Sequence, residues 1–323
     1  MAANRDYRDS ERDIYATGYN PDQAAEDLVV VAHVTNTDSR PRLHFVHYAC
    51  HPTTLAWDNS MLSPDFVGAT RETIAQHTGL PCVYFNGPCG ELGPKDGFTG
   101  DIAVADRNGR QLGYAALESL GPDRHDHCYA GPVVSGATIG TWAWTPFADD
   151  RETAARRWFG DTFHVDLPYR PLPNPEALQA DLVTHTETQR RADEVGDEAV
   201  ARDAGAKAER SRRWLRRIAE LPQGAGCPYG FSVLEMGDAI WITYSAEPYS
   251  TLASELRVQF PSKVIVINPV AGDSQLAYLL PKDRYGIGLY QEEPSSLAAG
   301  FLEVVTDAMT KAIESLTGLS PSL

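Results

Sequence analysis

The chain has 323 residues, of which 42% are hydrophobic and 22% are charged, so it can bury a substantial core as one large domain or two smaller ones. Its formal net charge of −16 makes nucleic acid and anionic membrane surfaces unfavourable partners. We expect a cytoplasmic protein, because the charged amino terminus does not resemble a signal peptide and no run approaches the roughly 20 apolar residues of a membrane span.

Short apolar runs alternate with helical patterns along the chain. This alternation predicts an α/β fold, a layered mixed β-sheet domain flanked by helices, which we expect to form one domain over residues 1–323. In chain order, the expected strands are 28–34, 43–49, 82–85, 137–142, 162–167, 230–235, 240–244 and 264–267. The expected helices are 65–77, 102–119, 250–258 and 297–316.

Residues 173–222 differ in character from the rest of the chain. The stretch is dense in Ala, Glu, Arg, Asp and Gln and contains no strand-like run, which predicts a helical hairpin insert or a long bent helix. Gly196 and Gly205 are possible breaks in it. Its charges fit a solvated helix face with i,i+4 pairs, so we assign it no chemistry.

The five cysteines form neither a disulfide framework nor a zinc ribbon, because their number is odd and no CxxC pair occurs. We expect most of them to be buried thiols. The cluster His125-Asp126-His127-Cys128 has the chemistry of metal ligands, but it follows Gly121-Pro122 in a loop. Adjacent loop residues rarely converge on one ion, so we do not assign a metal to this cluster.

The most informative segment is His47-Tyr48-Ala49-Cys50-His51-Pro52-Thr53-Thr54, which Ser63, Asp65 and Gly68 follow. The aromatic and β-branched run before it predicts a strand, and Pro52 should end that strand near His51 because proline cannot donate to the ladder. Catalytic groups of α/β enzymes lie at such strand ends. A lone histidine is a weak signal and more often only caps the strand.

Two later strands also end in polar segments. Strand 82–85 leads into Asn86-Gly87-Pro88-Cys89-Gly90-Glu91-Leu92-Gly93-Pro94, a glycine-rich loop that can turn tightly near a ligand. Strand 240–244 leads to Glu247, which should be half-buried and should need a cation as its partner. After the next strand, Tyr278, Tyr285 and Tyr290 lie close together in sequence; a single tyrosine there would more often be a packing residue.

Together these segments resemble the neutral ceramidase family, zinc-dependent amidases that hydrolyse an N-acyl bond. The family's HPTS or HGTS segment and its Ser-x-Asp-x-x-Gly are similar to His51-Pro52-Thr53-Thr54 and to Ser63, Asp65 and Gly68. Its Gly-Glu-Phe segment is similar to Ala246-Glu247-Pro248-Tyr249, and its tyrosines to Tyr278, Tyr285 and Tyr290. The similarity covers most of the chain and is loosest through the helical insert.

The resemblance implies a zinc-dependent amidohydrolase with Zn²⁺ as cofactor and a small N-acyl amide as substrate, either ceramide or a soluble amide. His51, Glu247 and Tyr278 would be the zinc ligands, and the metal-activated water would attack the amide carbon. Tyr290 and Arg5 would meet the substrate carbonyl and stabilise the oxyanion. Members of this family are often secreted, unlike the cytoplasmic placement expected from the amino terminus.

Two departures from the family pattern leave an alternative open. The family has a His-Thr-His segment upstream of its Asn-Arg pair, which supplies one more zinc ligand and a general acid, whereas Met1-Ala2-Ala3 precede Asn4-Arg5 here. We therefore expect an amino-terminally truncated family domain. Gly93 stands where the family has a serine, which excludes a serine nucleophile in that loop. The alternative is a non-catalytic homologue that binds a ligand or partner without hydrolysis; no Gly-x-Ser-x-Gly elbow supports a serine hydrolase.

Overall fold

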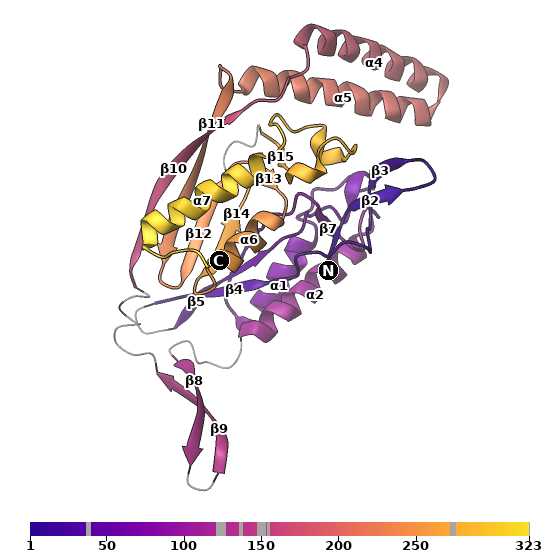
Figure 1. The fold of residues 1–323 in the computed structure, drawn as a ribbon. Coiled ribbons are helices and arrows are strands. Elements are labelled where there is room, and N and C mark those ends of the chain that lie inside the picture. Colours follow the sequence, from indigo (N-terminus) through magenta and orange to yellow (C-terminus); the bar gives the residue numbers. More distant parts are fainter. Residues whose placement is uncertain are drawn as a thin grey trace.

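The computed structural model describes residues 1–36, 40–120, 127–135, 138–146, 153, 156–271 and 276–322. It confirms the α/β class: several sheets are flanked by helices (Figure 1). The helices are α1 (Phe66–Thr78), α2 (Ile102–Leu120), α4 (Pro175–Val195), α5 (Glu198–Glu220), α6 (Thr251–Gln259) and α7 (Phe301–Thr317). Three 3-10 turns are η1 (Ala56–Asp58), η2 (Lys282–Arg284) and η3 (Tyr290–Glu292).

Two sheets make up the body of the molecule. The first has the order β4-β5-β6 and consists of Val30–Thr35, Pro41–Tyr48 and Cys82–Asn86. The second has the order β10-β11-β12-β14 and consists of Trp158–Pro168, Gly226–Met236, Ala239–Tyr244 and Val264–Asn268. Each is mixed, because β5 and β6 run parallel, as do β12 and β14, while the other neighbours are antiparallel.

Strand β5 shows how the first sheet divides its side chains between two faces. Val46 and Tyr48 point to one face, where they pack with residues of α1 and α2 in small buried clusters. Phe45 points to the other face, and its ring lies 6.0 Å from that of Trp241 on β12. Alternate residues of a strand face opposite sides, so one face meets helices and the other meets the second sheet.

The second sheet repeats this division. Ile240, Ile242 and Tyr244 of β12 belong to the largest buried cluster, which also contains residues of α6 and α7. Trp241 points the other way, toward Phe45 and Phe85 of the first sheet. The two sheets therefore meet through aromatic side chains, and helix pairs cover the outer faces in an α/β/β/α layering.

The predicted elements of this body are confirmed, with boundaries shifted by a few residues. Seven additional short or peripheral strands have no counterpart in the prediction: β1 (Ala2–Asn4), β2 (Asp6–Asp9), β3 (Ile14–Thr17), β7 (Leu92–Pro94), β8 (His127–Ser135), β13 (Glu247–Pro248) and β15 (Tyr278–Leu279). Strand β8 pairs with β9 (Thr138–Pro146), and that hairpin projects from the body (Figure 1). Several of these strands are only two to four residues long, too short to show a period-2 pattern.

The insert is a helical hairpin, as the sequence predicts. Helices α4 and α5 pack against each other and project from the ends of β10 and β11 (Figure 1). Asn174 caps α4 through hydrogen bonds from the backbone of Glu176 and Ala177, and Gly196 ends it with φ of 74°. The other suggested break is wrong, because Gly205 lies inside α5. The hairpin contacts the body where the Trp214 indole donates to Glu293, 3.0 Å away, beside η3.

Four of the five cysteines are confirmed as free, buried thiols: Cys50, Cys82, Cys89 and Cys227. The metal-like cluster that begins at His125 falls partly outside the described residues. Among the described residues, no helix has both the length and the apolar character that a membrane span needs.

Candidate active site

The candidate site lies where the parallel strands of both sheets end. His51 follows β5, the glycine-rich loop follows β6, Glu247 follows β12, and Tyr278 follows β14. Because the carboxyl ends of parallel strands lie at one edge of a sheet, segments far apart in the sequence meet there. The structure also brings Arg5, between β1 and β2, to the same place, since β1 pairs with β7 of the glycine-rich loop.

His51 and Glu247 form the centre of the cluster. Nε2 of His51 lies 3.1 Å from Oε2 of Glu247, and the side chains are 15% and 28% exposed. Nδ1 of His51 donates to the backbone carbonyl of Leu92 at 3.0 Å, which fixes the ring and directs Nε2 into the cluster. Glu247 is thus half-buried with a cationic partner, as its position before Pro248 predicts.

The pKa values of this pair favour an ion pair. Burial alone would lower the pKa of His51, but electrostatic attraction and a hydrogen bond to the Cys89 sulfur, together with the hydrogen bond to Glu247, outweigh burial and raise it to about 10. Burial opposes the charge of Glu247 as well, yet hydrogen bonding and attraction to His51 lower its pKa below the ordinary value. A proton therefore stays on the imidazole across the neutral range in the metal-free protein.

Arg5 joins the cluster through hydrogen bonds to the glycine-rich loop. Its Nε and Nη2 donate to the carbonyl of Gly90 at 3.2 and 2.8 Å, and Nη2 donates to the Tyr278 hydroxyl at 3.2 Å. The same Nη2 lies 3.5 Å from Nε2 of His51. Arg5 is only 6% exposed, so this guanidinium is a fixed positive charge at the centre of the site.

Gly90 allows this approach because it has no side chain. A Cβ atom there would lie 2.9 Å from the ring of Tyr249 and 3.1 Å from the carbonyl of Glu247. Gln291 also donates to the Gly90 carbonyl, at 3.0 Å, and so connects the loop to η3. The glycine thus packs the loop against the strand that carries Glu247.

Glu247 and Tyr278 are held by strained backbone. They are register partners of the parallel pair β13–β15, and the backbone nitrogen of Glu247 donates to the carbonyl of Ala277 at 2.8 Å. The residues just before them, Ala246 and Ala277, have φ of 129° and 57°, which side-chain-bearing residues rarely adopt. Such conformations persist where the surrounding structure fixes them, and they concentrate at functional sites.

Tyr290 borders the cluster, whereas Tyr285 does not enter it. The Tyr290 ring lies 6.1 Å from the Tyr278 ring, and the residue is 46% exposed. The Tyr285 hydroxyl instead lies 3.5 Å from Ser295 Oγ and 3.5 Å from the Leu297 carbonyl. Of the residues with an assigned role, Arg5, His51, Glu247, Tyr278 and Tyr290 all lie in or beside one cluster, and their roles stay predictions.

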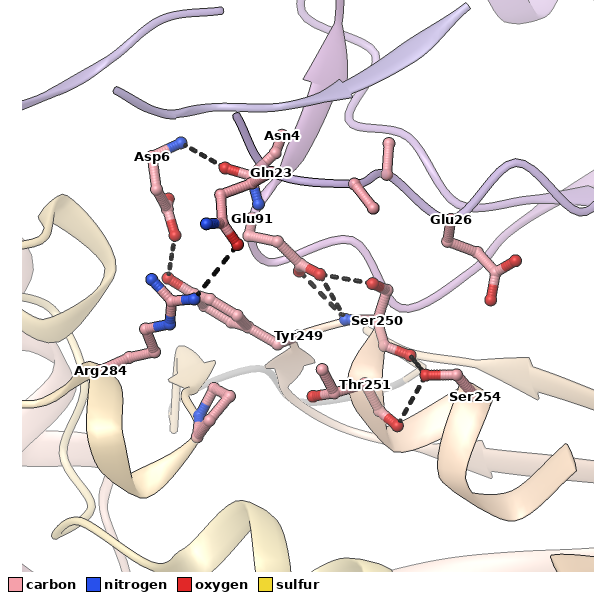
Figure 2. A pocket seen from close by; sticks show the side chains of 13 residues that line it. Asn4, Asp6, Gln23, Glu26, Glu91, Tyr249, Ser250, Thr251, Ser254 and Arg284 are labelled. Atoms are coloured by element: carbon pink, nitrogen blue, oxygen red, sulfur yellow. Dashed lines mark hydrogen bonds between the residues drawn. The ribbon is translucent and has the colours of Figure 1, made fainter. Parts of the chain in front are cut away.

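Two buried carboxylates, Asp6 and Glu91, line a separate pocket (Figure 2), and the sequence assigned no role to either. Asp6 accepts hydrogen bonds from the Tyr249 hydroxyl at 2.9 Å and from Gln291 at 2.8 Å. Glu91 accepts from the backbone and hydroxyl of Ser250. Burial raises the pKa of both, that of Glu91 to about 7. Asp6 directly follows Asn4-Arg5, and Glu91 lies in the glycine-rich loop. The position of these charged residues in or beside segments already linked to the site could have pointed to them.

The donor atoms of the cluster are chemically suited to zinc. An imidazole nitrogen, a carboxylate and a phenol oxygen are all donors of the kind that zinc accepts, and the Leu92 carbonyl fixes the tautomer that such a histidine needs. Among the described residues, however, no group of three or more His, Cys, Asp or Glu side chains is arranged to hold a metal ion. His33 and His44, whose rings contact each other, and His47, which bonds the Ile267 carbonyl, do not add a ligand.

Comparisons with known proteins place the fold. No protein-family profile matches the sequence, and no curated protein matches it. Among solved structures, neutral ceramidase from Pseudomonas aeruginosa matches with a TM-score of 0.56 at 14% identity, over 99% of this chain and 51% of that one. A ceramidase complexed with C2 matches with a TM-score of 0.56 at 11% identity, over 100% of this chain and 53% of that one. The chain spans about half the length of these structures and shares the fold of ceramidases.

Proposed function

We propose that this protein is a zinc-dependent amidohydrolase of the ceramidase type that hydrolyses an N-acyl bond. The observation that carries the proposal is the convergence of His51, Glu247, Tyr278 and Arg5 at the carboxyl edge of the sheets, in a fold shared with ceramidases. Fold likeness at such low identity does not carry function by itself, so the side chains at this edge are the main support.

His51, Glu247 and Tyr278 would hold the zinc ion. When bound, zinc would lower the pKa of a water ligand and so supply a nucleophile at neutral pH. To accept the ion, His51 must release the proton that it shares with Glu247. Zinc should bind weakly if these three side chains are its complete protein shell. Zinc sites of enzymes usually have three strong protein ligands, whereas Tyr278 can bind only after its hydroxyl loses a proton, and burial raises the pKa of that hydroxyl.

The remaining residues would act on the substrate. Arg5 would present a rigid guanidinium to the substrate carbonyl, and Tyr290 is an exposed residue beside Tyr278. Both are hydrogen-bond donors that can stabilise negative charge on the carbonyl oxygen as it becomes tetrahedral. Because Gly90 fixes Arg5 in advance, little reorganisation is needed during the reaction.

The test is hydrolysis of a panel of N-acyl amines with added zinc. We expect release of amine that stops on chelation and falls by at least 100-fold on Glu247→Ala, since removal of a metal ligand impairs both binding and activation of water. Tyr290→Phe should lower kcat with little change in KM. Turnover that survives both chelation and His51→Ala would overturn the proposal.

The second candidate is a non-catalytic homologue that binds an amide ligand without cleaving it. The observation that favours it is Gly93, a residue without a side chain in the loop beside Arg5. In this case the same panel would bind to the protein in a manner that depends on Arg5, and no amine would be released at any zinc concentration.

A further inference from the structure

A cavity of about 550 Å³ borders the cluster, and apart from Arg5 none of its lining side chains has a role above. It lies between the β1–β2 segment, the η1 turn and the segment that follows β7. The side chains and backbone that matter for its chemistry come from Arg5, Tyr19, Trp57, Gly93, Lys95 and Phe98.

Arg5 is shared by this cavity and the candidate active site. Its guanidinium bonds to Tyr278, while its Cδ lies 3.6 Å from where a Cβ of residue 93 would be. Gly93 thus leaves room directly beside Arg5. Oγ1 of Thr53 lies 4.0 Å from the same point, is buried, and has no hydrogen-bond partner among the described residues. Thr53 does not line the cavity, so Arg5 and Gly93 are the residues that connect it with the candidate active site.

One wall of the cavity is aromatic. The rings of Trp57 and Phe98 lie 6.2 Å apart, and Trp57 is 74% exposed. Phe98 has φ of 55°, and its backbone nitrogen donates to the Thr53 carbonyl at 3.3 Å, so the strained residue is tied to the segment after His51. An exposed indole beside a second ring is a ready surface for stacking an aromatic group.

The charge of the cavity is opposite to that of the whole protein. Lys95 places its ammonium 5.0 Å from the centre of the Tyr19 ring, and Arg5 adds a second cation. The described lining residues include no carboxylate, although the chain has 44 acidic and 28 basic residues. A cationic pocket in so acidic a chain favours a ligand with a negative charge.

We propose that this cavity binds an aromatic side chain and a carboxylate of the substrate, so that the preferred substrates are N-acylated aromatic amino acids. The inference rests on the proposed function. The ring would stack on Trp57 and Phe98, the carboxylate would pair with Lys95, and the amide would lie at Arg5. Water adds to the carbonyl carbon and the carbon–nitrogen bond breaks; the acid keeps the oxygen of water, and a proton passes to the amine.

Binding can be measured without hydrolysis, by calorimetry with three probes on the full chain. N-acetylphenylalanine carries the ring and the carboxylate, N-acetylphenylalaninamide lacks the charge, and N-acetylalanine lacks the ring. We expect N-acetylphenylalanine to bind at least about threefold more tightly than either of the other two. Its advantage over the carboxamide should shrink as salt is added, because screening weakens exposed ion pairs.

Two substitutions separate the contributions. Lys95→Gln should abolish the preference for the carboxylate over the carboxamide, and Trp57→Ala should abolish the preference for the ring. Both side chains are exposed, so folding should be preserved, as thermal unfolding would verify. Lys207→Gln, at an exposed position of α5, is the matched control and should change neither preference.

Equal affinity for the carboxylate and the carboxamide, or a preference that survives Lys95→Gln, would overturn the inference. This outcome is distinguishable from failure of the proposed function. Charge-dependent binding without cleavage of any N-acyl amide would contradict the amidohydrolase proposal and support the assignment of the cavity. Cleavage of N-acyl amides without preference for the carboxylate would support the amidohydrolase proposal and contradict the assignment of the cavity.

Discussion

Glu247 and Tyr278 are register partners on two parallel strands of two residues each, and each directly follows an alanine with positive φ. Helix, sheet and turn propensities do not favour such conformations at alanine, which cost on the order of 1–2 kcal/mol in the left-handed region. The surrounding buried cluster, which contains Ala246, Ala277 and Tyr278, must therefore impose them. The backbone strain has the effect of presenting the carboxylate and the phenol side by side.

Substitution of Ala277 should show how this strain is distributed. Ala277→Gly should change the free energy of unfolding by less than about 1 kcal/mol, because relief at φ of 57° is offset by the entropy that glycine loses on folding. Ala277→Val should destabilise by more than about 2 kcal/mol, since a β-branched residue is strained at this φ and the site is 5% exposed. Urea unfolding measures both. Equal effects of the two substitutions would contradict the assignment of strain.

Arg5 is predicted to act through its fork of donors as well as through its charge. Arg5→Lys keeps the charge, but its single nitrogen cannot reproduce the planar arrangement in which Nε and Nη2 both donate to Gly90 while Nη2 also donates to Tyr278. On the proposed function, kcat should therefore fall by about 10²-fold, as on loss of an oxyanion donor. Steady-state kinetics on an N-acyl substrate provide the measurement. The matched control is Arg8→Lys on β2, where the side chain is 43% exposed, and its kcat should be unchanged. A similar loss in both variants would point to a general effect of the segment.

Zinc binding should depend steeply on pH. With a pKa of about 10, metal-free His51 is protonated from pH 6.5 to 8.5, so each zinc that binds must displace a proton from it. The proton from His51 should raise the affinity about tenfold per pH unit over this range, and the proton that Tyr278 loses should raise it about tenfold more, so that the total is about a hundredfold per pH unit. A histidine near its ordinary pKa of about 6.5 would contribute little above pH 7 and would leave only the tenfold change from Tyr278. Competition with a chelating dye measures the slope. His77→Ala should leave the slope unchanged and His51→Ala should abolish binding; a slope of only about tenfold per pH unit in the unmodified protein would refute the ion pair.

The sequence was informative where long apolar runs end in unusual polar residues. His51 after β5 and Glu247 after β12 could be placed because each strand shows the composition and period of a buried strand. The contacts of Arg5 could not be derived in the same way, since they depend on β1, a strand of three residues that pairs with another of three. The glycine-rich loop indicated close packing at Gly90, but the hydrogen bonds that its carbonyl accepts from Arg5 and Gln291 leave no trace in residue type. The single-domain prediction over residues 1–323 stays a prediction.

The buried carboxylates could not be predicted from the sequence either, because Asp6 and Glu91 look like ordinary exposed acids until the fold encloses them.

The burial of these two carboxylates predicts how stability depends on pH. Burial raises the pKa of Glu91 to about 7, above the value of about 4.5 expected when unfolded, so between these values the folded state binds more protons than the unfolded state. The free energy of unfolding should therefore fall as pH rises from about 4.5 to 7 and level off above 7. Asp6, whose pKa is also raised, acts in the same direction.

The change attributable to Glu91 should be about 3.5 kcal/mol at most, which follows from the shift of its pKa from 4.5 to about 7 at about 1.4 kcal/mol per unit. Glu91→Gln keeps an oxygen that can accept from the backbone of Ser250 but cannot ionise. This variant should be more stable than the parent protein at pH 8 and should lose most of the pH dependence. Thermal and urea unfolding between pH 5 and 8.5 give the slopes. Glu72→Gln, at an exposed position of α1, should retain the parental slope. If Glu91→Gln retains it as well, then the buried carboxyl ionises at its ordinary pH and Ser250 stabilises the charge more than burial opposes it.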